Sequence, residues 1–421
     1  MLAESLEANV FHYNAAISAC EKGRQWLLAL DLLSHMPDVR VIPDEISYNA
    51  AISACEKGGQ WQLALGLLSS MPGLRVVPNK ITYNAAISAC EKGEQWQLAL
   101  GLLSSMPDIR LIPDEISYSA AISSCEKVGQ WQLALRLLSS MLDMRVVPDK
   151  INYSAAISAC EKGGQWQLAL GLLNNMPSMR IVRDVIAYNA AISACEKGGQ
   201  WRLALGLLTS MPDVKVIPNV ISYNGAISAF EKGGQWQMAL SLLRSMLDMM
   251  VIPNKITYSA AISACEKGGR WQMALSLLSS MPDARVIPNE VTYGAAISAC
   301  EKGRHWQPAL SLLSSMPDLR IFQDEFSYNA AISSCSKEGQ WQISLRLPSS
   351  MPDMRVAPNE ITYNAAIHSC ESCGQWQLAL NVLSLMPAGG VVPDTITYSA
   401  AMSVAAGTEF AEPNARGKGG T

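Results

Sequence analysis

The sequence predicts an all-α fold, a right-handed superhelical α-solenoid of stacked antiparallel helix pairs. Three observations predict it: a 35-residue repeat, two helical patterns inside each repeat, and glycine or proline where each pattern ends. Tyrosine recurs every 35 residues from Tyr13 to Tyr398, and the eleven tryptophans keep the same period from Trp26 to Trp376. One helix pair cannot bury its own apolar surface, so successive copies must stack on each other.

The first helix of a repeat is illustrated by the residues that follow Asp44. Asp44 is a favourable N-cap residue, and apolar residues then follow at three- and four-residue spacing from Tyr48 to Cys55. A glycine pair comes next, and glycine supplies the positive φ that the end of a helix often requires. A first helix is therefore expected between Asp44 and Gly58.

The second helix is predicted to begin at Trp61. Its apolar face comprises Trp61, Ala64, Leu65, Leu68 and Met71. Pro72 and Pro78 are expected to stop it and to hold the return segment extended. Pro348 lies inside a second helix, where proline costs about 3 kcal/mol, whereas Pro308 lies in a first turn and should be tolerated.

The repeat period defines the predicted organisation of the chain. Residues 1–9 are a lead-in, 10–394 form eleven complete repeats, 395–405 begin a partial twelfth repeat, and 406–421 form a flexible tail. The partial repeat lacks its second helix, which leaves an apolar face uncovered. We therefore expect a truncated chain, a fragment, or a cap that lies elsewhere.

Composition excludes several classes of protein. The chain has 421 residues, a net charge of −4 and 49% hydrophobic residues, so it is too apolar for wholesale disorder. No uninterrupted run of about 18 apolar residues is present, which argues against a membrane span. The mild acidity argues against a polycationic protein that binds nucleic acid through its net charge alone.

The cysteines occupy one position of the repeat and are expected to be buried free thiols in a reducing compartment. They are Cys20, Cys55, Cys90, Cys125, Cys160, Cys195, Cys265, Cys300, Cys335 and Cys370. Phe230 fills the same position in the remaining complete repeat, which indicates a packing site. Cys373 forms a C-x-x-C pair with Cys370 near His368, but no second pair completes a tetrahedral metal site. No catalytic constellation recurs or stands alone, so we expect no enzyme, no metal, no cofactor and no small-molecule substrate.

Two positions vary within a small polar alphabet. The residue after the tyrosine is Asn14, Asn49, Asn84, Ser119, Ser154, Asn189, Asn224, Ser259, Gly294, Asn329, Asn364 and Ser399. The last residue of each repeat is Asp44, Asn79, Asp114, Asp149, Asp184, Asn219, Asn254, Asn289, Asp324, Asn359 and Asp394. Helix capping can explain the second set, but Asn and Ser are poor helix formers at the first position.

Two further rows accompany these polar residues. An aliphatic or aromatic row comprises Ile46, Ile81, Ile116, Ile151, Ile186, Ile221, Ile256, Val291, Phe326 and Ile361. Ile46, Asn49 and Ser53 share one helical face, so this face can hydrogen-bond a base edge while aliphatic side chains pack on the base. A lysine row comprises Lys22, Lys57, Lys92, Lys127, Lys162, Lys197, Lys232, Lys267, Lys302 and Lys337. These lysines either complement the helix C-terminus beside the glutamate row or contact phosphates.

The repeat resembles the pentatricopeptide repeat family in its pure 35-residue form. The residues that carry the resemblance are the I-S-Y-N opening at 46–49, the L-A-L-x-L-L second helix at 63–68, and the V-x-P-D/N close. The tryptophan and the E-K-G-G-Q-W signature depart from the usual family text. A tetratricopeptide repeat fits less well, because the period is 35 rather than 34 and its W-x-x-L-G-x-x-Y pattern is missing.

The resemblance implies sequence-specific binding of single-stranded RNA, with one base per repeat. In that family the two polar residues choose the base: Asn with Asp favours U, Asn with Asn favours C or U, Ser with Asp favours G, and Ser with Asn favours A. The Gly294 and Asp324 pair departs from the usual combinations, and its Asp suggests G. The implied ligand is 5′-UYUGGYYAGYU, with Y most often C, and the aliphatic row resembles the family residues that sandwich the bases.

The resemblance also implies RNA processing, stabilisation or translation in a chloroplast or mitochondrion, with other RNA-processing proteins as further partners. The opening MLAESLEAN lacks the Arg- and Ser-rich character of a transit peptide. The alternative function is a protein-binding α-solenoid scaffold, which the low charge suits. A degenerate duplicate without a ligand is a third interpretation.

Overall fold

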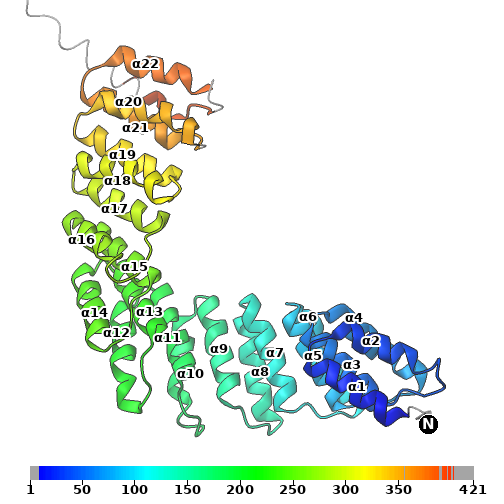
Figure 1. Cartoon of the computed structure of the whole chain (residues 1–421). Helices are drawn as coiled ribbons and strands as arrows, with labels where there is room; N and C mark the ends of the chain where they lie inside the picture. The colour runs from blue at the N-terminus through cyan, green and yellow to red at the C-terminus, as the bar shows by residue number, and fades with distance from the viewer. Residues whose placement is uncertain (1–8, 355, 388–390, 396, 400–401, 403–421) are drawn as a thin grey trace, which may run out of the picture. The chain divides into compact units, whose positions relative to one another are not determined.

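The computed structural model describes residues 9–402 except 355, 388–390, 396, 400 and 401. Among these residues it contains helices and connecting segments but no β-strand, which confirms the all-α class (Figure 1). The lead-in before residue 9, parts of 395–405 and the predicted tail at 406–421 lie outside the described residues. The chain divides into two compact units, Met1–Ile217 and Pro218–Thr421.

The first unit contains alternating longer and shorter helices. They are α1 (Val10–Lys22), α2 (Trp26–His35), α3 (Glu45–Lys57), α4 (Trp61–Ser70), α5 (Lys80–Lys92), α6 (Trp96–Ser105), α7 (Glu115–Val128), α8 (Trp131–Asp143), α9 (Lys150–Lys162), α10 (Trp166–Asn175), α11 (Val185–Lys197) and α12 (Trp201–Ser210). Short 3₁₀ turns follow three of the second helices, at η1 (Pro72–Leu74), η2 (Pro107–Ile109) and η3 (Pro212–Val214).

The second unit repeats this alternation. Its helices are α13 (Val220–Lys232), α14 (Trp236–Asp248), α15 (Lys255–Lys267), α16 (Trp271–Ser280), α17 (Glu290–Lys302), α18 (Trp306–Ser315), α19 (Glu325–Lys337), α20 (Trp341–Ser350), α21 (Glu360–Ser372) and α22 (Trp376–Leu385). Its 3₁₀ turns are η4 (Pro317–Leu319) and η5 (Pro352–Met354).

Within each unit the helices form two layers. Each first helix packs against the first helix of the next repeat, as α1 does on α3 and α3 on α5. Each second helix packs against its own first helix and against the following one, as α2 does on α1 and α3. Stacked antiparallel helix pairs are therefore confirmed within each unit.

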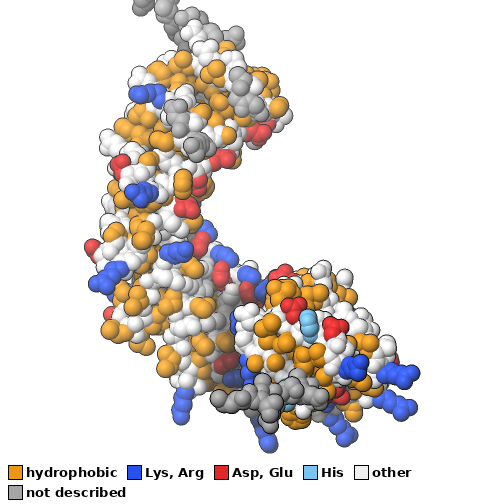
Figure 2. All heavy atoms as spheres, turned by 45° about the vertical axis from the view of Figure 1, so that its right-hand side comes forward, with side chains coloured by type: hydrophobic (Ala, Val, Ile, Leu, Met, Phe, Trp, Pro, Cys, Tyr) orange, Lys and Arg blue, Asp and Glu red, His pale blue; other side chains and the backbone are white. Residues whose placement is uncertain are grey.

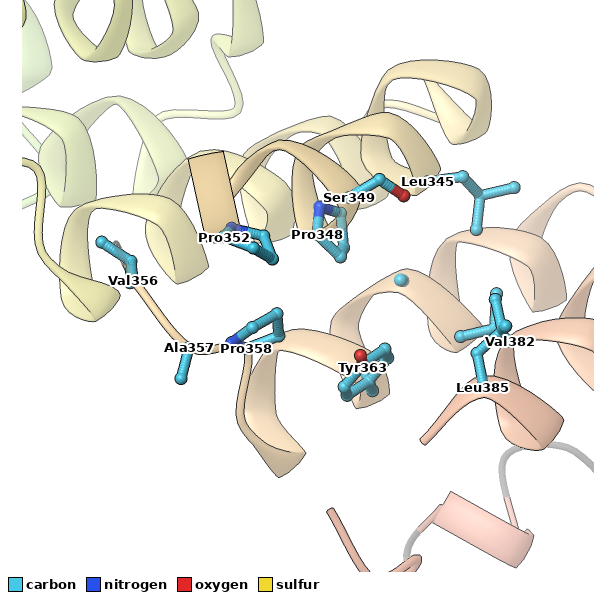
Figure 3. Close-up of a pocket in the computed structure, with 11 residues that line it drawn as sticks. Leu345, Pro348, Ser349, Pro352, Val356, Ala357, Pro358, Tyr363, Val382 and Leu385 are labelled. Carbon is cyan, nitrogen blue, oxygen red and sulfur yellow. The ribbon is translucent and has the colours of Figure 1, made fainter. Parts of the chain in front are cut away.

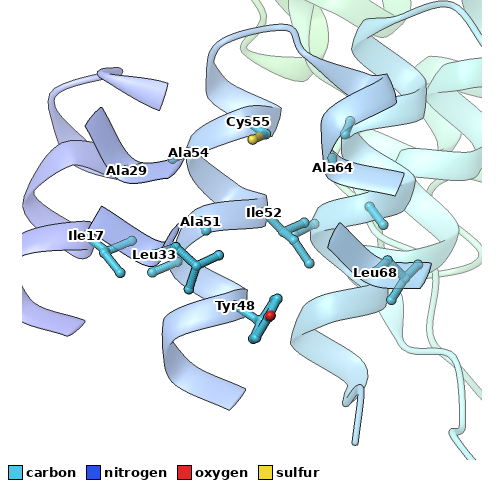
Figure 4. Close-up of a cluster of buried hydrophobic side chains, with 14 of the residues drawn as sticks. Ile17, Ala29, Leu33, Tyr48, Ala51, Ile52, Ala54, Cys55, Ala64 and Leu68 are labelled. Carbon is cyan, nitrogen blue, oxygen red and sulfur yellow. The ribbon is translucent and has the colours of Figure 1, made fainter. Parts of the chain in front are cut away.

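The core runs between successive pairs and is rich in small residues. Ala51, Ala54 and Cys55 of α3 are fully buried and face neighbouring helices, together with the larger Ile52 and Tyr48 (Figure 4). Small side chains on the first helices allow these helices to approach closely along the stack. A fully buried Ile or Leu contributes about 1.5–3 kcal/mol, so the repeated core accounts for most of the stability of the stack.

Within each unit, the tryptophan that opens a second helix packs in most repeats against the glycine pair of the next repeat. A Cβ added to Gly58 would lie 2.4 Å from Cδ1 of Trp26, and one added to Gly93 would lie 2.3 Å from Cδ1 of Trp61. The first glycine of the pair is therefore needed for space, because its φ is an ordinary −85° at Gly58. The second glycine supplies the positive φ, which is +72° at Gly59.

The return segment differs from the extended conformation expected between the two prolines. Pro72 begins the 3₁₀ turn η1, and the chain then passes through Arg75 at a φ of +57°. Other repeats place Arg40, Arg110 and Arg145 in the same left-handed region. Glycine is the residue that usually adopts a positive φ. Because arginine stands at this position, the turn could not be predicted from the sequence.

Pro348 lies inside α20, which continues through it from Trp341 to Ser350. It stands where most other second helices carry a buried leucine such as Leu68. A cavity of ≈540 Å³ lies beside it, lined by Leu345, Tyr363 and Val382 among others (Figure 3). Similar hollows lie beside repeats that carry leucine at this position, such as one of ≈770 Å³ lined by Leu33 and Tyr48. The hollow is therefore a feature of the stacked repeats, and the helix continues intact through the proline. Pro308 is accommodated near the start of α18.

Candidate functional site

Within each unit, repeats with asparagine in the first polar position bring the two polar positions together across the repeat boundary. In the first unit Asn14 Nδ2 donates to Asp44 Oδ1 at 3.0 Å, and Asn84 Nδ2 donates to Asp114 Oδ1 at 3.1 Å. The same bond joins other pairs at 3.2–3.4 Å, namely Asn49 to Asn79, Asn224 to Asn254, and Asn329 to Asn359. Residues 30 positions apart therefore form one polar pair.

The second residue of each pair is also a helix N-cap. Asp44 Oδ1 accepts the backbone N–H of Ser47 at 2.9 Å, and Asn79 Oδ1 accepts that of Thr82 at 3.0 Å. The capping interpretation is confirmed, and one oxygen of each cap residue faces the helix. Capping and pairing use the same oxygen, so the second polar atom of the cap side chain is turned away from the helix.

A third polar residue belongs to the site and was missed by the sequence analysis. Ser47 Oγ donates to Asn14 Oδ1 at 2.5 Å and accepts the backbone N–H of Asp44 at 3.2 Å. Thr82 makes the same two bonds with Asn49 and Asn79. The sequence does have serine or threonine at the third position of most repeats. That pattern is equally typical of a capping box, so it did not by itself indicate a contact with the preceding repeat.

The repeats with serine or glycine in the first polar position differ from this arrangement. Ser119 Oγ accepts Asn152 Nδ2 at 2.8 Å, and Ser259 Oγ donates to the helix carbonyl of Lys255 at 2.8 Å. Ser154 Oγ is buried and has no hydrogen-bond partner among the residues that the structure describes. The third residue of the next repeat is Ala187. An unpartnered buried hydroxyl costs about 1–3 kcal/mol, which a ligand could recover.

The space left by the missing side chain of Gly294 is occupied by an aromatic neighbour. A Cβ at Gly294 would lie 3.1 Å from Cδ1 of Phe326 and 3.5 Å from the Ser327 hydroxyl. Phe326 occupies the row in which most other repeats have isoleucine. Its ring therefore fills the space that an asparagine amide takes elsewhere, and the two departures from the repeat pattern are coupled.

The aliphatic row is exposed along both units. Its ten predicted members from Ile46 to Ile361 retain between 54% and 63% of their accessible surface. Phe11 stands at the same position of the first repeat, is 84% exposed, and was missed by the sequence analysis. Hydrophobic side chains also reach the surface elsewhere, interspersed with cations that project into solvent (Figure 2). A regular row of exposed branched side chains beside a polar pair marks a candidate binding face.

The lysine row is engaged by glutamates from the preceding repeat. Lys57 Nζ lies 2.7 Å from Glu21 Oε1, and Lys92 Nζ lies 2.8 Å from Glu56 Oε1. The same pairing is found for Lys127, Lys162, Lys197, Lys267, Lys302 and Lys337. Half-exposed pairs of this kind contribute about 0.2–1 kcal/mol each, so they fasten neighbouring repeats weakly. A phosphate contact by these lysines stays a prediction.

The carboxylates of the polar pairs have perturbed acidity. Burial opposes ionisation of Asp44, but hydrogen bonds from the Ser47 backbone and the Asn14 amide outweigh it and lower the pKa. The pKa of Asp114 is lowered in the same way, with Lys80 adding attraction. Both residues are therefore anionic acceptors at neutral pH.

The cysteines lie within the core, as expected for a packing position. Cys20 through Cys370 of the repeat row are buried free thiols, and burial raises the pKa of Cys55 to about 11. Cys373 stands where other repeats have the glycine that contacts tryptophan, and its Sγ lies 3.5 Å from the Gly339 carbonyl. No group of three or more His, Cys, Asp or Glu residues suited to a metal ion is found in the described part of the chain. None of the described helices is both long and apolar enough to cross a membrane.

Comparison with solved structures shows the same fold. The chain aligns with the crystal structure of the pentatricopeptide repeat protein PPR10 from maize, with a TM-score of 0.56 and 20% sequence identity. The alignment covers 94% of this chain and 66% of PPR10, so the chain spans slightly less than two thirds of that protein. PPR10 in complex with an 18-nt psaJ RNA element aligns with a TM-score of 0.43 and 18% identity, over 97% of this chain and 73% of that one. No curated protein sequence matches the chain significantly.

Family models match along the chain from residue 1 to residue 406, with short gaps. The model described as PPR repeat family matches 43–92, 183–232, 218–267, 323–372 and 358–406. The pentatricopeptide repeat domain matches 1–60, and the PPR repeat matches 81–111, 116–146, 151–181, 256–286 and 291–321. With the helix pairs and the recurring polar pairs, these matches show that the chain belongs to the pentatricopeptide repeat family.

Proposed function

We propose that this protein binds single-stranded RNA sequence-specifically, with one base per repeat, in support of RNA processing, stabilisation or translation in a chloroplast or mitochondrion. The observation that carries the proposal is the exposed aliphatic row next to the polar pairs. Each pair offers hydrogen-bonding groups for a base edge, and each row member offers an apolar surface for a base face. The RNA complex of PPR10 adds support from the same family.

The hydrogen bonds within each pair account for the choice between the two pyrimidines. In an Asn and Asp pair such as Asn14 and Asp44, the amide keeps one N–H and the carboxylate keeps one oxygen for a ligand. One donor and one acceptor complement uracil, whose N3–H lies between carbonyl oxygens. The pair is therefore suited to U.

An Asn and Asn pair presents a different pattern. Asn254 Oδ1 accepts three N–H groups, from Ile256 at 3.0 Å, from Thr257 at 3.1 Å and from Asn224 Nδ2 at 3.2 Å. The Asn254 amide nitrogen is then turned outward beside that of Asn224, so the pair offers two donors. Adjacent N3 and O2 acceptors are found on cytosine, which favours C for Y in 5′-UYUGGYYAGYU.

Fluorescence anisotropy with a labelled eleven-nucleotide RNA tests the proposal. The predicted RNA, with C at each Y, is compared with its complement, with a version that has A at the fourth and fifth bases, and with the same sequence as DNA. Each mismatch should weaken binding by about 1–3 kcal/mol. Equal and salt-sensitive binding of every strand would reduce the interaction to electrostatics. No binding by folded protein at low salt would contradict RNA binding.

A protein-binding scaffold is the second candidate, and one observation favours it. The loop that precedes each first helix carries a separate exposed apolar row, with Ile42 80% exposed, Ile217 85% exposed and Ile287 85% exposed. Each of these isoleucines lies two residues before the N-cap member of a polar pair and takes no part in the hydrogen bonds of that pair. Retained partner binding in a variant that has lost RNA binding would support this role.

A further inference from the structure

We propose that the third residue of each repeat positions the asparagine of the preceding repeat for base selection. Its side-chain hydroxyl, called here the cap hydroxyl, is provided by Ser47, Thr82, Ser117, Thr257, Thr362 and Thr397. The cap hydroxyl fixes which end of the asparagine amide faces the ligand. This inference rests on the proposed RNA-binding function and deepens it.

The hydrogen-bond geometry around Thr257 shows how the amide is oriented. The hydroxyl oxygen accepts the backbone N–H of Asn254 at 3.0 Å, and its single proton faces Asn224 Oδ1 at 2.6 Å. The other candidate acceptor, Asn254 Oδ1, is farther away at 3.1 Å. The proton is therefore donated to Asn224, whose carbonyl oxygen is held inside the pair.

The opposite orientation of the amide is disfavoured by two contacts. Asn224 Nδ2 donates to Asn254 Oδ1 at 3.2 Å. Rotation of the amide by half a turn would place the Asn224 carbonyl against that oxygen, and two acceptors would face each other. It would also leave the Thr257 proton without its closest acceptor. Asn224 therefore presents N–H, and not C=O, to a base.

The same contact recurs along both units. The cap hydroxyl lies 2.5 Å from the asparagine Oδ1 for Ser47, Thr82 and Ser117, 2.6 Å for Thr362 and 2.7 Å for Thr397. Thr257 retains no exposed surface. Because this buried hydrogen bond recurs at nearly constant length, we infer that it has the same role in each of these repeats.

Helix capping alone does not require this hydroxyl. Asp184 caps α11 through the backbone N–H of Ala187 at 2.9 Å, and alanine has no hydroxyl. In that repeat the first polar residue is Ser154 and there is no amide to orient. Asn152 is the other third residue without a hydroxyl, and the repeat before it has Ser119 in the first polar position. Both pairs that lack the hydroxyl therefore also lack the asparagine.

Loss of the hydroxyl should relax base choice more than affinity. Without it the Asn224 amide can turn its carbonyl outward and accept the N3–H of uracil as well. The seventh repeat would then accept U nearly as well as C. A hydroxyl with a purely structural role would instead affect the binding of both bases equally.

The test compares Thr257→Ala with Thr257→Ser and with Thr209→Ala as a matched control. Thr209 is an exposed threonine of α12 that bonds only to helix carbonyls of its own helix. Anisotropy measures Kd for the predicted RNA with C or U at the seventh base. We expect C to be preferred about tenfold by the unmodified protein, by Thr257→Ser and by Thr209→Ala. Thr257→Ala should lower this ratio to about threefold or less.

Two results would overturn the inference: an unchanged C-to-U ratio in Thr257→Ala, or weaker binding of both RNAs by the same factor. Thr82→Ala tests the same contact independently at the second base, should Thr257→Ala fail to fold. If the unmodified protein is folded and binds no RNA, the proposed function itself fails. If it binds RNA selectively but the alanine variants keep their selectivity, only the cap-hydroxyl role fails.

Discussion

Two glycines of one repeat should respond in opposite ways to the same substitution. Gly163 ends α9 and Gly171 lies inside α10, eight residues farther along the chain. A Cβ on Gly163 would lie 2.2 Å from Cδ1 of Trp131, whereas one on Gly171 would have nothing within 4 Å. Gly163→Ala is therefore expected to destabilise the repeat and Gly171→Ala to stabilise it.

The magnitudes follow from packing and helix propensity. Gly163 has a φ of −80°, so alanine meets no backbone strain and the cost is overpacking, about 1–3 kcal/mol. The indole is too bulky to move aside freely. Gly171→Ala removes the helix-interior penalty of glycine, about 0.8–1.0 kcal/mol. The two variants should differ by about 2–4 kcal/mol.

Urea unfolding followed by far-UV circular dichroism measures the difference. Both substitutions lie in residues 150–184, so they act on the same repeat and the same neighbours, and midpoints can be compared directly. Val128 shows how the chain accommodates a side chain at this position, since α7 runs one residue longer and its cap moves to Gly129. An equal or higher midpoint for Gly163→Ala than for Gly171→Ala would refute the reasoning.

Four further outcomes are expected. Burial raises the pKa of the repeat-row cysteines from Cys55 to Cys370 to about 11, so they should resist iodoacetamide at pH 8 while half-buried Cys373 reacts first. Intact-mass labelling that modifies several of these thiols in folded protein would contradict this. Pro348→Leu should raise the unfolding midpoint, because it restores a helix N–H inside α20 and removes the clash of the proline ring, with a gain of up to about 3 kcal/mol. The pKa of Asp44 is lowered in the folded protein, so its ionised form stabilises the fold above the ordinary aspartate pKa. This stabilisation is lost as pH falls through the lowered pKa. The free energy of unfolding of Asp44→Asn should therefore fall less steeply with acidification than that of the unmodified protein. The double variant Gly294→Asn with Phe326→Ile recreates an Asn and Asp pair and should shift base choice at the ninth position to U, whereas unchanged choice in anisotropy would count against the pair's role.

The sequence by itself determined the repeat, the helices and the position of the polar pairs. These features are local: helix periodicity, an N-cap such as Asp44 and the glycine that follows the first helix each depend on residues within a few positions. Copying a unit of 35 residues then fixed the spacing of everything else. For this reason the row from Ile46 to Ile361 and the capping role of Asp44 could be predicted without a structure, although Phe11 at the start of that row was missed.

Tertiary structure alone decided the contacts that cross repeat boundaries. Ser47 reaches Asn14 across 33 residues, and Lys57 reaches Glu21 across 36, so both depend on how far one helix pair is displaced along the next. The contact between Trp26 and Gly58 has the same origin. Periodicity places such residues in rows, but it does not say which member of one row faces which member of another. Stacking of the helix pairs sets that register, and with it which polar atoms each pair leaves for a ligand.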